Sequence, residues 1–158
     1  MPESAMDAVD RKILAALQTD ARLTVEKIGA MVGLSASPCA RRIRRLEGLG
    51  VIRGYVAVLD QEKAGLPVSV FASVKLERQR EEDLDRFAAA VAGWPEIVEC
   101  YLMTGPRDYL LRIVVRDLEA YESFLKRRLT RLDGVASIES SFALAQVKHS
   151  NCLPLGGA

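Results

Sequence analysis

The amino-acid sequence predicts an α+β chain, because segments with helical spacing fill its first third and strand-like and helix-like segments alternate in the remainder. The order of the later segments is strand, helix, strand, strand, helix, strand. Charge is also uneven: four arginines fall within five positions of the first third, whereas the formal net charge of the whole chain is only +1. These observations divide the chain into a helical domain, residues 1–60, and a sheet-forming domain, residues 61–158.

The helical domain begins with two short amphipathic helices. Asp7 is a candidate N-cap with Asp10 three positions on, and the second helix begins at Thr24, another good N-cap residue. It ends at Gly33, because glycine tolerates the left-handed conformation of a tight turn. The apolar positions of the two helices keep helical spacing: Val9, Ile13, Leu14 and Leu17, then Ile28, Met31 and Val32.

A third helix is predicted in the stretch SASPCARRIRRLEGLG. Ser35 or Ser37 can cap it, and Pro38 fits its first turn because the missing N–H would have no intrahelical partner. At about 100° per residue, the apolar side chains fall on one face and most arginines on the opposite face with Ser37, while Arg42 lies on the flank. The apolar face holds Cys39, Ile43 and Leu46, and the polar face holds Arg41, Arg44 and Arg45.

Two short helices, a glycine-bearing turn and an arginine-rich third helix are typical of a helix-turn-helix, whose third helix enters the DNA major groove. The following stretch, VIRGYVAVLD, predicts a strand or short wing, so residues 1–60 are expected to form a winged helix-turn-helix. Guanidinium groups suit both phosphates and guanine edges. The alternative is a solvated cationic face, which is the usual meaning of a charge run. The candidate DNA-binding residues are Ser35, Ser37, Pro38, Arg41, Arg42, Arg44 and Arg45.

The second domain is predicted to be ferredoxin-like, with a βαββαβ order and both helices on one face of the sheet. Its strands are expected in VSVFASVKL, IVECYLM, YLLRIVV and VASIESSFALAQV, and its helices in EEDLDRFAAAVAGW and LEAYESFLKRRL. The turn GPRD joins the middle strands as a hairpin. The other face of the sheet carries apolar or small residues that solvent covers poorly, so a homodimer is expected.

Composition argues against several classes of protein. The cysteines, Cys39, Cys100 and Cys152, are odd in number without CxxC spacing, and His149 has no partner set, so neither a disulfide framework nor a metal site is predicted. No nucleophile beside a base and no phosphate loop is evident, so we expect no catalytic residues, no enzyme and no cofactor. Without a membrane-length apolar run or a signal-peptide pattern, the expected location is the cytoplasm, with no membrane partner.

The stretch TGPRDY between the two middle strands has the groups needed to bind a free amino acid. Gly105 lets backbone N–H groups approach a carboxylate, Asp108 can pair with an ammonium group, and Leu102 can touch a side chain. The alternative is a plain β-turn, with Pro106 present to fix φ. Arg107 complicates the binding interpretation, because it can itself pair with a carboxylate or with Asp108.

The order and spacing of several segments resemble the Lrp/AsnC family of bacterial and archaeal transcription regulators over nearly the full length. These segments are DRKILAALQTDAR, VGLSASPCARRIRRLEGLGVIRGYVAVLD, VECYLMTGPRDYLLRIV and DGVASIESSFALAQVK. The resemblance implies DNA binding by the third helix, dimerisation through the second domain, frequent assembly into octamers, and an amino-acid effector between subunits. It places the effector near Leu102, Thr104, Gly105, Asp108 and Tyr109, facing a strand that includes Phe142, Ala143 and Leu144.

The resulting interpretation is a sequence-specific DNA-binding regulator whose DNA affinity or assembly responds to an amino acid or related metabolite. Its expected partners are double-stranded DNA, the effector and further copies of the chain. The alternative is an architectural DNA-binding protein with no effector. The modest net charge of the chain argues against it, since packaging relies chiefly on phosphate neutralisation. Ligand-dependent DNA binding or assembly distinguishes the two.

Overall fold

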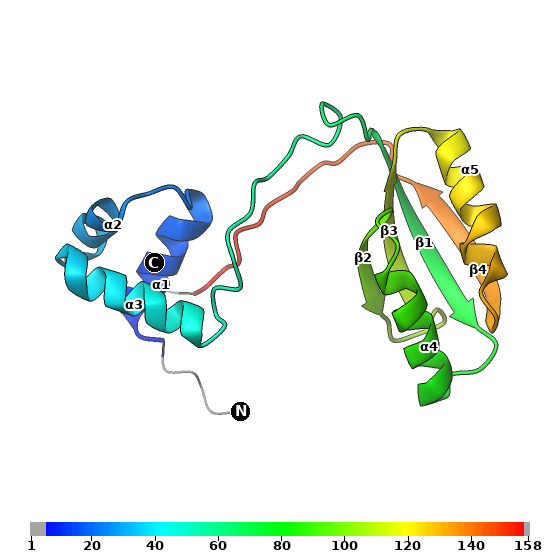
Figure 1. The fold of residues 1–158 in the computed structure, drawn as a ribbon, viewed down its shortest axis with the longest axis horizontal. Helices are drawn as coiled ribbons and strands as arrows, with labels where there is room; N and C mark the ends of the chain where they lie inside the picture. Colours follow the sequence, from blue (N-terminus) through cyan, green and yellow to red (C-terminus); the bar gives the residue numbers. More distant parts are fainter. Residues whose placement is uncertain (1–5, 157–158) are drawn as a thin grey trace. The chain divides into compact units, whose positions relative to one another are not determined.

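A computed structural model describes residues 6–156, which fall into two compact units (Figure 1). The first unit contains residues 6–57 and 147–156, and the second contains residues 58–146. The predicted boundary after residue 60 is therefore close, but the assignment of the whole stretch 61–158 to one domain needs correction. Residues 147–156 belong to the helical unit, because their backbone hydrogen-bonds to α1 and one apolar side chain packs against the helical core.

Three helices form the first unit: α1 (Ala8–Thr19), α2 (Val25–Val32) and α3 (Ala36–Gly48). The predicted capping box is present, since Asp7 accepts a hydrogen bond from Asp10 N at 2.8 Å and Asp10 accepts one from Asp7 N at 3.2 Å. Thr24 caps α2, and Gly33 ends it in the left-handed conformation at φ 75°. Ser35 occupies the N-cap position of α3 but its side chain makes no capping hydrogen bond.

The core of this unit follows the predicted apolar faces, with one exception. Met31 is 63% exposed, so it is not a core residue. Gly29 lies where α2 meets the following turn, and a Cβ there would stand 2.6 Å from the carbonyl oxygen of Leu34. The close approach of these two backbone segments sets the turn between α2 and α3. The buried core residues are Ile13, Leu14, Ala16, Ile28, Cys39, Ile43 and Leu46.

The predicted strand or wing after α3 is absent from the described chain. Residues 53–60 form no strand, and most of their apolar side chains are exposed, including Val56 at 86% and Leu59 at 73%. A strand needs a partner for its backbone hydrogen bonds, and no described segment pairs with this one. The β-branched composition predicted a strand here, but composition does not supply that partner.

The C-terminal segment returns to α1 of the first unit. Arg11 donates a hydrogen bond to the carbonyl of Leu155 at 2.7 Å. Gln18 donates to the carbonyl of Leu153 at 3.2 Å and accepts from Leu153 N at 2.6 Å. Leu155 also packs against the core. The helical unit is thus assembled from both ends of the chain, and it is joined to the second unit by two segments.

The second unit confirms the predicted βαββαβ order and its hairpin. Its four strands form one antiparallel sheet in the order β2-β3-β1-β4, which places β2 and β4 at the two edges. The elements are β1 (Val68–Leu76), α4 (Glu81–Ala92), β2 (Ile97–Leu102), β3 (Tyr109–Val115), α5 (Leu118–Arg127), the short 3-10 helix η1 (Leu129–Arg131) and β4 (Val135–Phe142).

Alternate residues of the sheet face α4 and α5 and form the core of this unit. The opposite face carries aromatic and aliphatic groups, with Phe71 37% and Tyr101 52% exposed. In the described part of the chain no helix is long and apolar enough to cross a bilayer. The buried core comprises Val70, Ala72, Val74, Leu76, Phe87, Val91, Tyr109, Leu111, Ile113, Val115, Tyr121, Phe124 and Leu129.

Candidate DNA-binding and effector sites

Helix α3 places the predicted DNA-binding residues on its outer face and flank. Cys39, Ile43 and Leu46 are buried beneath the helix, so the remaining positions point away from the core. Pro38 and Arg42 are half-buried, and the exposed members of the predicted set are Ser35, Ser37, Arg41, Arg44 and Arg45.

Two of the four arginines are bound to a buried carboxylate of α1. Asp10 is fully buried, and Arg42 Nη1 lies 2.9 Å from its Oδ1, while Arg45 Nη2 pairs with its Oδ2. Arg42 Nη1 also lies 2.7 Å from Asp7 Oδ2. Because Arg42 and Arg45 are three positions apart, they share the flank of α3 that faces the start of α1.

These contacts divide the predicted arginine surface into two kinds of residue. Hydrogen bonds to Asp7 and Asp10 raise the pKa of Arg42. The pKa of Asp7 is lowered, mainly by the hydrogen bond from the backbone N–H of Asp10 and next by the hydrogen bond from Arg42. Within residues 6–156 no carboxylate pairs with Arg41 or Arg44. The helix therefore presents two uncompensated guanidinium groups rather than four.

Sequence reasoning missed this role of Asp10, although a signal was present. Asp10, Ile13, Leu14 and Leu17 follow the i, i+3, i+4, i+7 pattern of one helix face, so Asp10 occupies the first position of an apolar stripe. An acid in that position requires a buried partner. The arginines of the third helix are the cationic residues that could have been proposed as this partner.

In the second unit, Asp108 stabilises the turn between β2 and β3. Its Oδ2 accepts a hydrogen bond from Leu76 N at 2.7 Å and from Gln79 at 3.4 Å, and its Oδ1 pairs with Lys75 Nζ at 3.2 Å. Burial raises the pKa of Asp108, but the hydrogen bonds from Leu76 N, Lys75 and Gln79 outweigh it and leave the pKa below its ordinary value. Asp108 therefore already has cationic and N–H partners within its own chain, and its role as an ammonium ligand stays a prediction.

Tyr109, another predicted effector residue, points into the core. Its ring stacks on Phe87 with centroids 4.4 Å apart, and its hydroxyl donates to the carbonyl of Leu84 at 2.9 Å. Only 4% of Tyr109 is exposed. Alternation along β3 directs the side chain toward α4, so Tyr109 belongs to the core of this chain and its contact with an effector stays a prediction.

The remaining predicted effector residues form two separate groups. The first group is exposed at one end of the sheet: Leu102 is the last residue of edge strand β2, and Thr104 and Gly105 follow it. The second group consists of Phe142 on edge strand β4 and the next two residues, Ala143 and Leu144, and it is also exposed. Phe142 pairs with Val70, which places this group at the opposite end of the sheet. Three strand spacings separate the edges by roughly 14 Å. One chain therefore does not bring the two groups together.

The structure addresses one of the two alternatives for Arg107, its pairing with Asp108. Its guanidinium lies 2.7 Å from Glu139 Oε2 and donates to Ser137 Oγ at 2.9 Å, so it pairs with β4 and not with Asp108. Gly105 has φ 105°, a conformation that favours glycine and accounts for its presence in the turn without a ligand.

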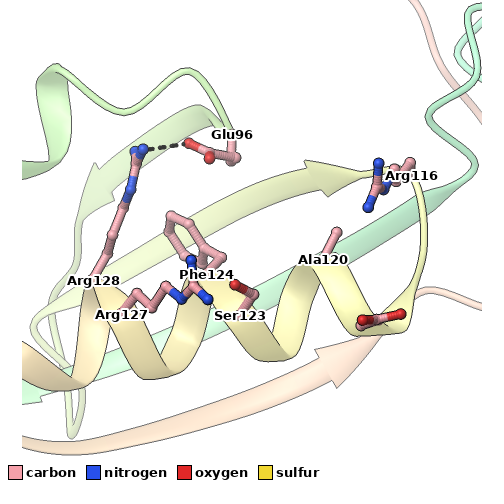
Figure 2. Close-up of a pocket in the computed structure, with 8 residues that line it drawn as sticks. Glu96, Arg116, Ala120, Ser123, Phe124, Arg127 and Arg128 are labelled. Atoms are coloured by element: carbon pink, nitrogen blue, oxygen red, sulfur yellow. Dashed lines mark hydrogen bonds and ion pairs between the residues drawn. The ribbon is translucent and has the colours of Figure 1, made fainter.

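A separate shallow pocket of about 350 Å³ lies along α5 and contains none of the predicted site residues (Figure 2). Arg128 lies 3.0 Å from Glu96 and 5.8 Å from the Trp94 ring centroid. The polar groups are partly neutralised by one another, and Phe124 forms an apolar wall. The lining residues are Glu96, Arg116, Glu119, Ala120, Ser123, Phe124, Arg127 and Arg128.

Two family models match the chain. The AsnC-type helix-turn-helix domain matches residues 6–47, and the Lrp/AsnC ligand binding domain matches residues 69–153. This chain belongs to the Lrp/AsnC family. Members of this family are transcription regulators rather than enzymes, and the predicted DNA-binding regulator is confirmed at that level.

Curated and solved relatives of this Lrp/AsnC protein are similar over nearly the whole length. The Bkd operon transcriptional regulator of Pseudomonas aeruginosa is 46% identical over 150 residues, which cover 95% of this chain and 98% of the relative. The crystal structure of an AsnC family regulator from Agrobacterium tumefaciens is 45% identical with a TM-score of 0.90, covering 95% and 97% of the two chains. A regulator from Neisseria meningitidis, solved as a complex with L-methionine, is 39% identical with a TM-score of 0.89 and the same coverages.

Proposed function

We propose that this Lrp/AsnC regulator binds double-stranded DNA through the outer face of α3, with Arg41 and Arg44 as its principal cationic contacts. The observation that carries this proposal is that both arginines project from α3 and pair with no carboxylate among residues 6–156. Ser35 and Ser37 precede them on exposed positions at the helix N-terminus, where hydroxyl and backbone N–H groups suit a phosphate.

Fluorescence anisotropy with a duplex selected from a random-sequence pool tests this interface. We expect R41Q and R44Q each to weaken binding and to flatten its salt dependence by about one phosphate contact. The matched control is R78Q, which removes an exposed arginine of the second unit. Equal behaviour of all three variants would place the DNA interface elsewhere.

The effector proposed from the sequence is an amino acid or related metabolite, and L-methionine is the first ligand to test because a relative binds it. The exposed turn Leu102–Gly105 supplies a positive-φ backbone and an aliphatic side chain, whereas the group around Phe142 lies at the opposite edge. A site that uses both groups requires two copies of the chain. Asp108 would then hold the turn in place through its bonds to β1.

Calorimetric titration of the twenty amino acids, followed by anisotropy with each binder, tests this part. We expect at least one to bind and to shift DNA affinity or assembly by a coupling of about 1–3 kcal/mol. Binding to DNA with no response to any of them would favour the architectural alternative, for which the internal pairing of Asp108 is the supporting observation.

A homodimer is the proposed basic assembly, with octamers built from it. Support comes from the uncovered sheet face bearing Phe71 and Tyr101, and from exposed Val56 and Leu59 on a backbone without strand partners. Light scattering after size exclusion measures the assembly, and F71E is expected to shift it toward the monomer. DNA as the partner also supports the cytoplasmic location predicted from the sequence.

A further inference from the structure

Four charged side chains at the junction of α1 and α3 form a neutral cluster. Its two carboxylates, Asp7 and Asp10, are bound by Arg42 and Arg45, and Asp10 contacts both arginines. The exposed fraction of the Asp10 side chain is zero, whereas those of Arg42 and Arg45 are 29% and 46%. The carboxylate is therefore the buried partner, and the two guanidinium groups cover it at the surface.

We propose that Asp10 is a specificity-determining positioning residue, which withholds Arg42 and Arg45 from DNA phosphates and leaves Arg41 and Arg44 to make the contacts. This inference rests on the proposed use of the outer face of α3. It assigns to Asp10 a role in DNA recognition although its side chain touches no DNA.

The pairing persists beside DNA because the two possible partners differ in burial. A phosphate at the surface keeps its water and counterions when an arginine stays away. The Asp10 carboxylate is fully buried in the cluster, so separating it from its cations costs more than an exposed ion pair gains. Arg42 is held more firmly than Arg45, since it pairs with Asp7 as well.

Withholding two cations favours discrimination between DNA sequences. Long, mobile arginines attract any phosphate backbone and raise affinity for all sequences alike, whereas contacts to base edges depend on the sequence. The Asp10 cluster also fixes α3 against α1, which orients Arg41 and Arg44 for the groove.

The test measures the salt dependence of DNA binding by single-residue variants of the full chain, with the selected duplex and a scrambled duplex. Losing one phosphate contact lowers the salt slope by about 0.9, which is about 3.5-fold in affinity change between 50 and 200 mM salt. We expect that loss for R41Q and R44Q. For R42Q and R45Q we expect an unchanged slope, because Asp10 holds these residues in the wild-type chain.

A second pair of variants separates release of the arginines from a simple change in net charge. D10N and D7N each remove one negative charge, but only D10N removes the carboxylate shared by both arginines. Asn also remains a good N-cap at position 7. We expect D10N to steepen the slope on the scrambled duplex by about 0.9 for each arginine released, and to reduce the ratio of selected to scrambled affinity, while D7N changes both less.

The outcomes distinguish this inference from the proposed DNA interface. Equal slope losses for R42Q, R45Q, R41Q and R44Q would overturn the role of Asp10 and leave the interface intact. No slope change for R41Q or R44Q would overturn the interface itself, and with it this inference. If D10N does not fold, as judged by circular dichroism, the R42Q and R45Q slopes decide the matter, because each of those chains keeps Asp10 and one arginine.

Discussion

Each unit of the described chain contains one buried carboxylate, and the two are stabilised differently. Asp10 in the helical unit is held by two arginines from a helix more than thirty residues away. Asp108 in the sheet unit is held by the backbone N–H of Leu76, together with Lys75 and Gln79. Asp10 thus joins two helices through side-chain charge, whereas Asp108 joins a turn to its neighbouring strand.

This difference assigns the same residue type to two settings, one in the proposed DNA interface and one in a turn of the sheet unit. The partners of Asp10 belong to α3, the helix proposed to contact DNA, so their pairing changes the charge that this helix presents. The partners of Asp108 belong to β1 or to the loop that follows it, so their pairing fixes the shape of the turn that carries Thr104 and Gly105. Removing either carboxylate therefore tests stability and function in different units.

The largest expected effect is the combined substitution R42M with R45M. It leaves the buried Asp10 carboxylate without a cation, and a broken buried ion pair of this kind costs about 3–5 kcal/mol. Urea unfolding followed by far-ultraviolet circular dichroism measures the loss. Trp94, the sole tryptophan, lies in the sheet unit, so its fluorescence should report a much smaller change.

The matched control for that prediction is R41M with R44M, which changes charge equally on the same helix but leaves Asp10 paired. We expect its effect on the free energy of unfolding to stay within about 0.5 kcal/mol, as for ordinary surface positions. Equal destabilisation by both double substitutions would contradict the division of the arginines into two kinds.

D108N should have the next largest effect, this time in the sheet unit. It removes the charge that strengthens hydrogen bonds from Leu76 N and Lys75, and we expect a loss of about 1–3 kcal/mol. Trp94 fluorescence during urea unfolding reports it. A loss of stability seen only by circular dichroism, with no change at Trp94, would place the effect in the helical unit and contradict this prediction.

The stability difference between wild type and D108N should also depend on pH, in a direction set by the pKa of Asp108. Because the pKa of folded Asp108 lies below its ordinary value of 3.8, its stabilising contribution is fully present above that value. It is lost as the pH falls through the folded pKa, when the carboxylate takes up a proton. The stability difference between wild type and D108N should therefore narrow below about pH 4, as measured at Trp94; a difference that widens on acidification contradicts the assigned partners.

L155A tests the discontinuous construction of the helical unit and should have a smaller effect. Leu155 is partly buried against the core, and truncating it should cost about 1 kcal/mol of the stability of that unit. L153A is the control, because Leu153 is 70% exposed and contributes to the structure through its backbone. Equal and negligible effects would show that the C-terminal segment adds nothing to this core.

Local pattern predicted the elements well because capping and amphipathic spacing act within a few residues. Asp7, Thr24 and Gly33 took the predicted positions, and the βαββαβ order held. The errors concern partners distant in sequence. Spacing did not show that residues 53–60 lack a strand partner, that Tyr109 faces α4, or that residues 147–156 return to α1.

The candidate sites were predicted as residue types rather than as pairings. The arginine run correctly identified the polar face of α3, yet it did not reveal which arginines Asp10 occupies, because that depends on how α1 packs against α3. The turn TGPRDY was located correctly, but its acidic and basic members pair with β1 and β4 instead of one another. Both corrections require the three-dimensional arrangement of side chains.

The smallest expected effect comes from E139Q, which removes the partner of Arg107 beside the same turn that Asp108 supports. The side chains of Arg107 and Glu139 are 37% and 64% exposed, so water and salt screen their attraction. We expect a loss of about 0.2–1 kcal/mol at low salt, measured by urea unfolding at Trp94, and almost none at 1 M salt. Because Asp108 is buried, the loss from D108N should persist at 1 M salt; equal salt sensitivity of E139Q and D108N would mean that burial does not separate these two carboxylates.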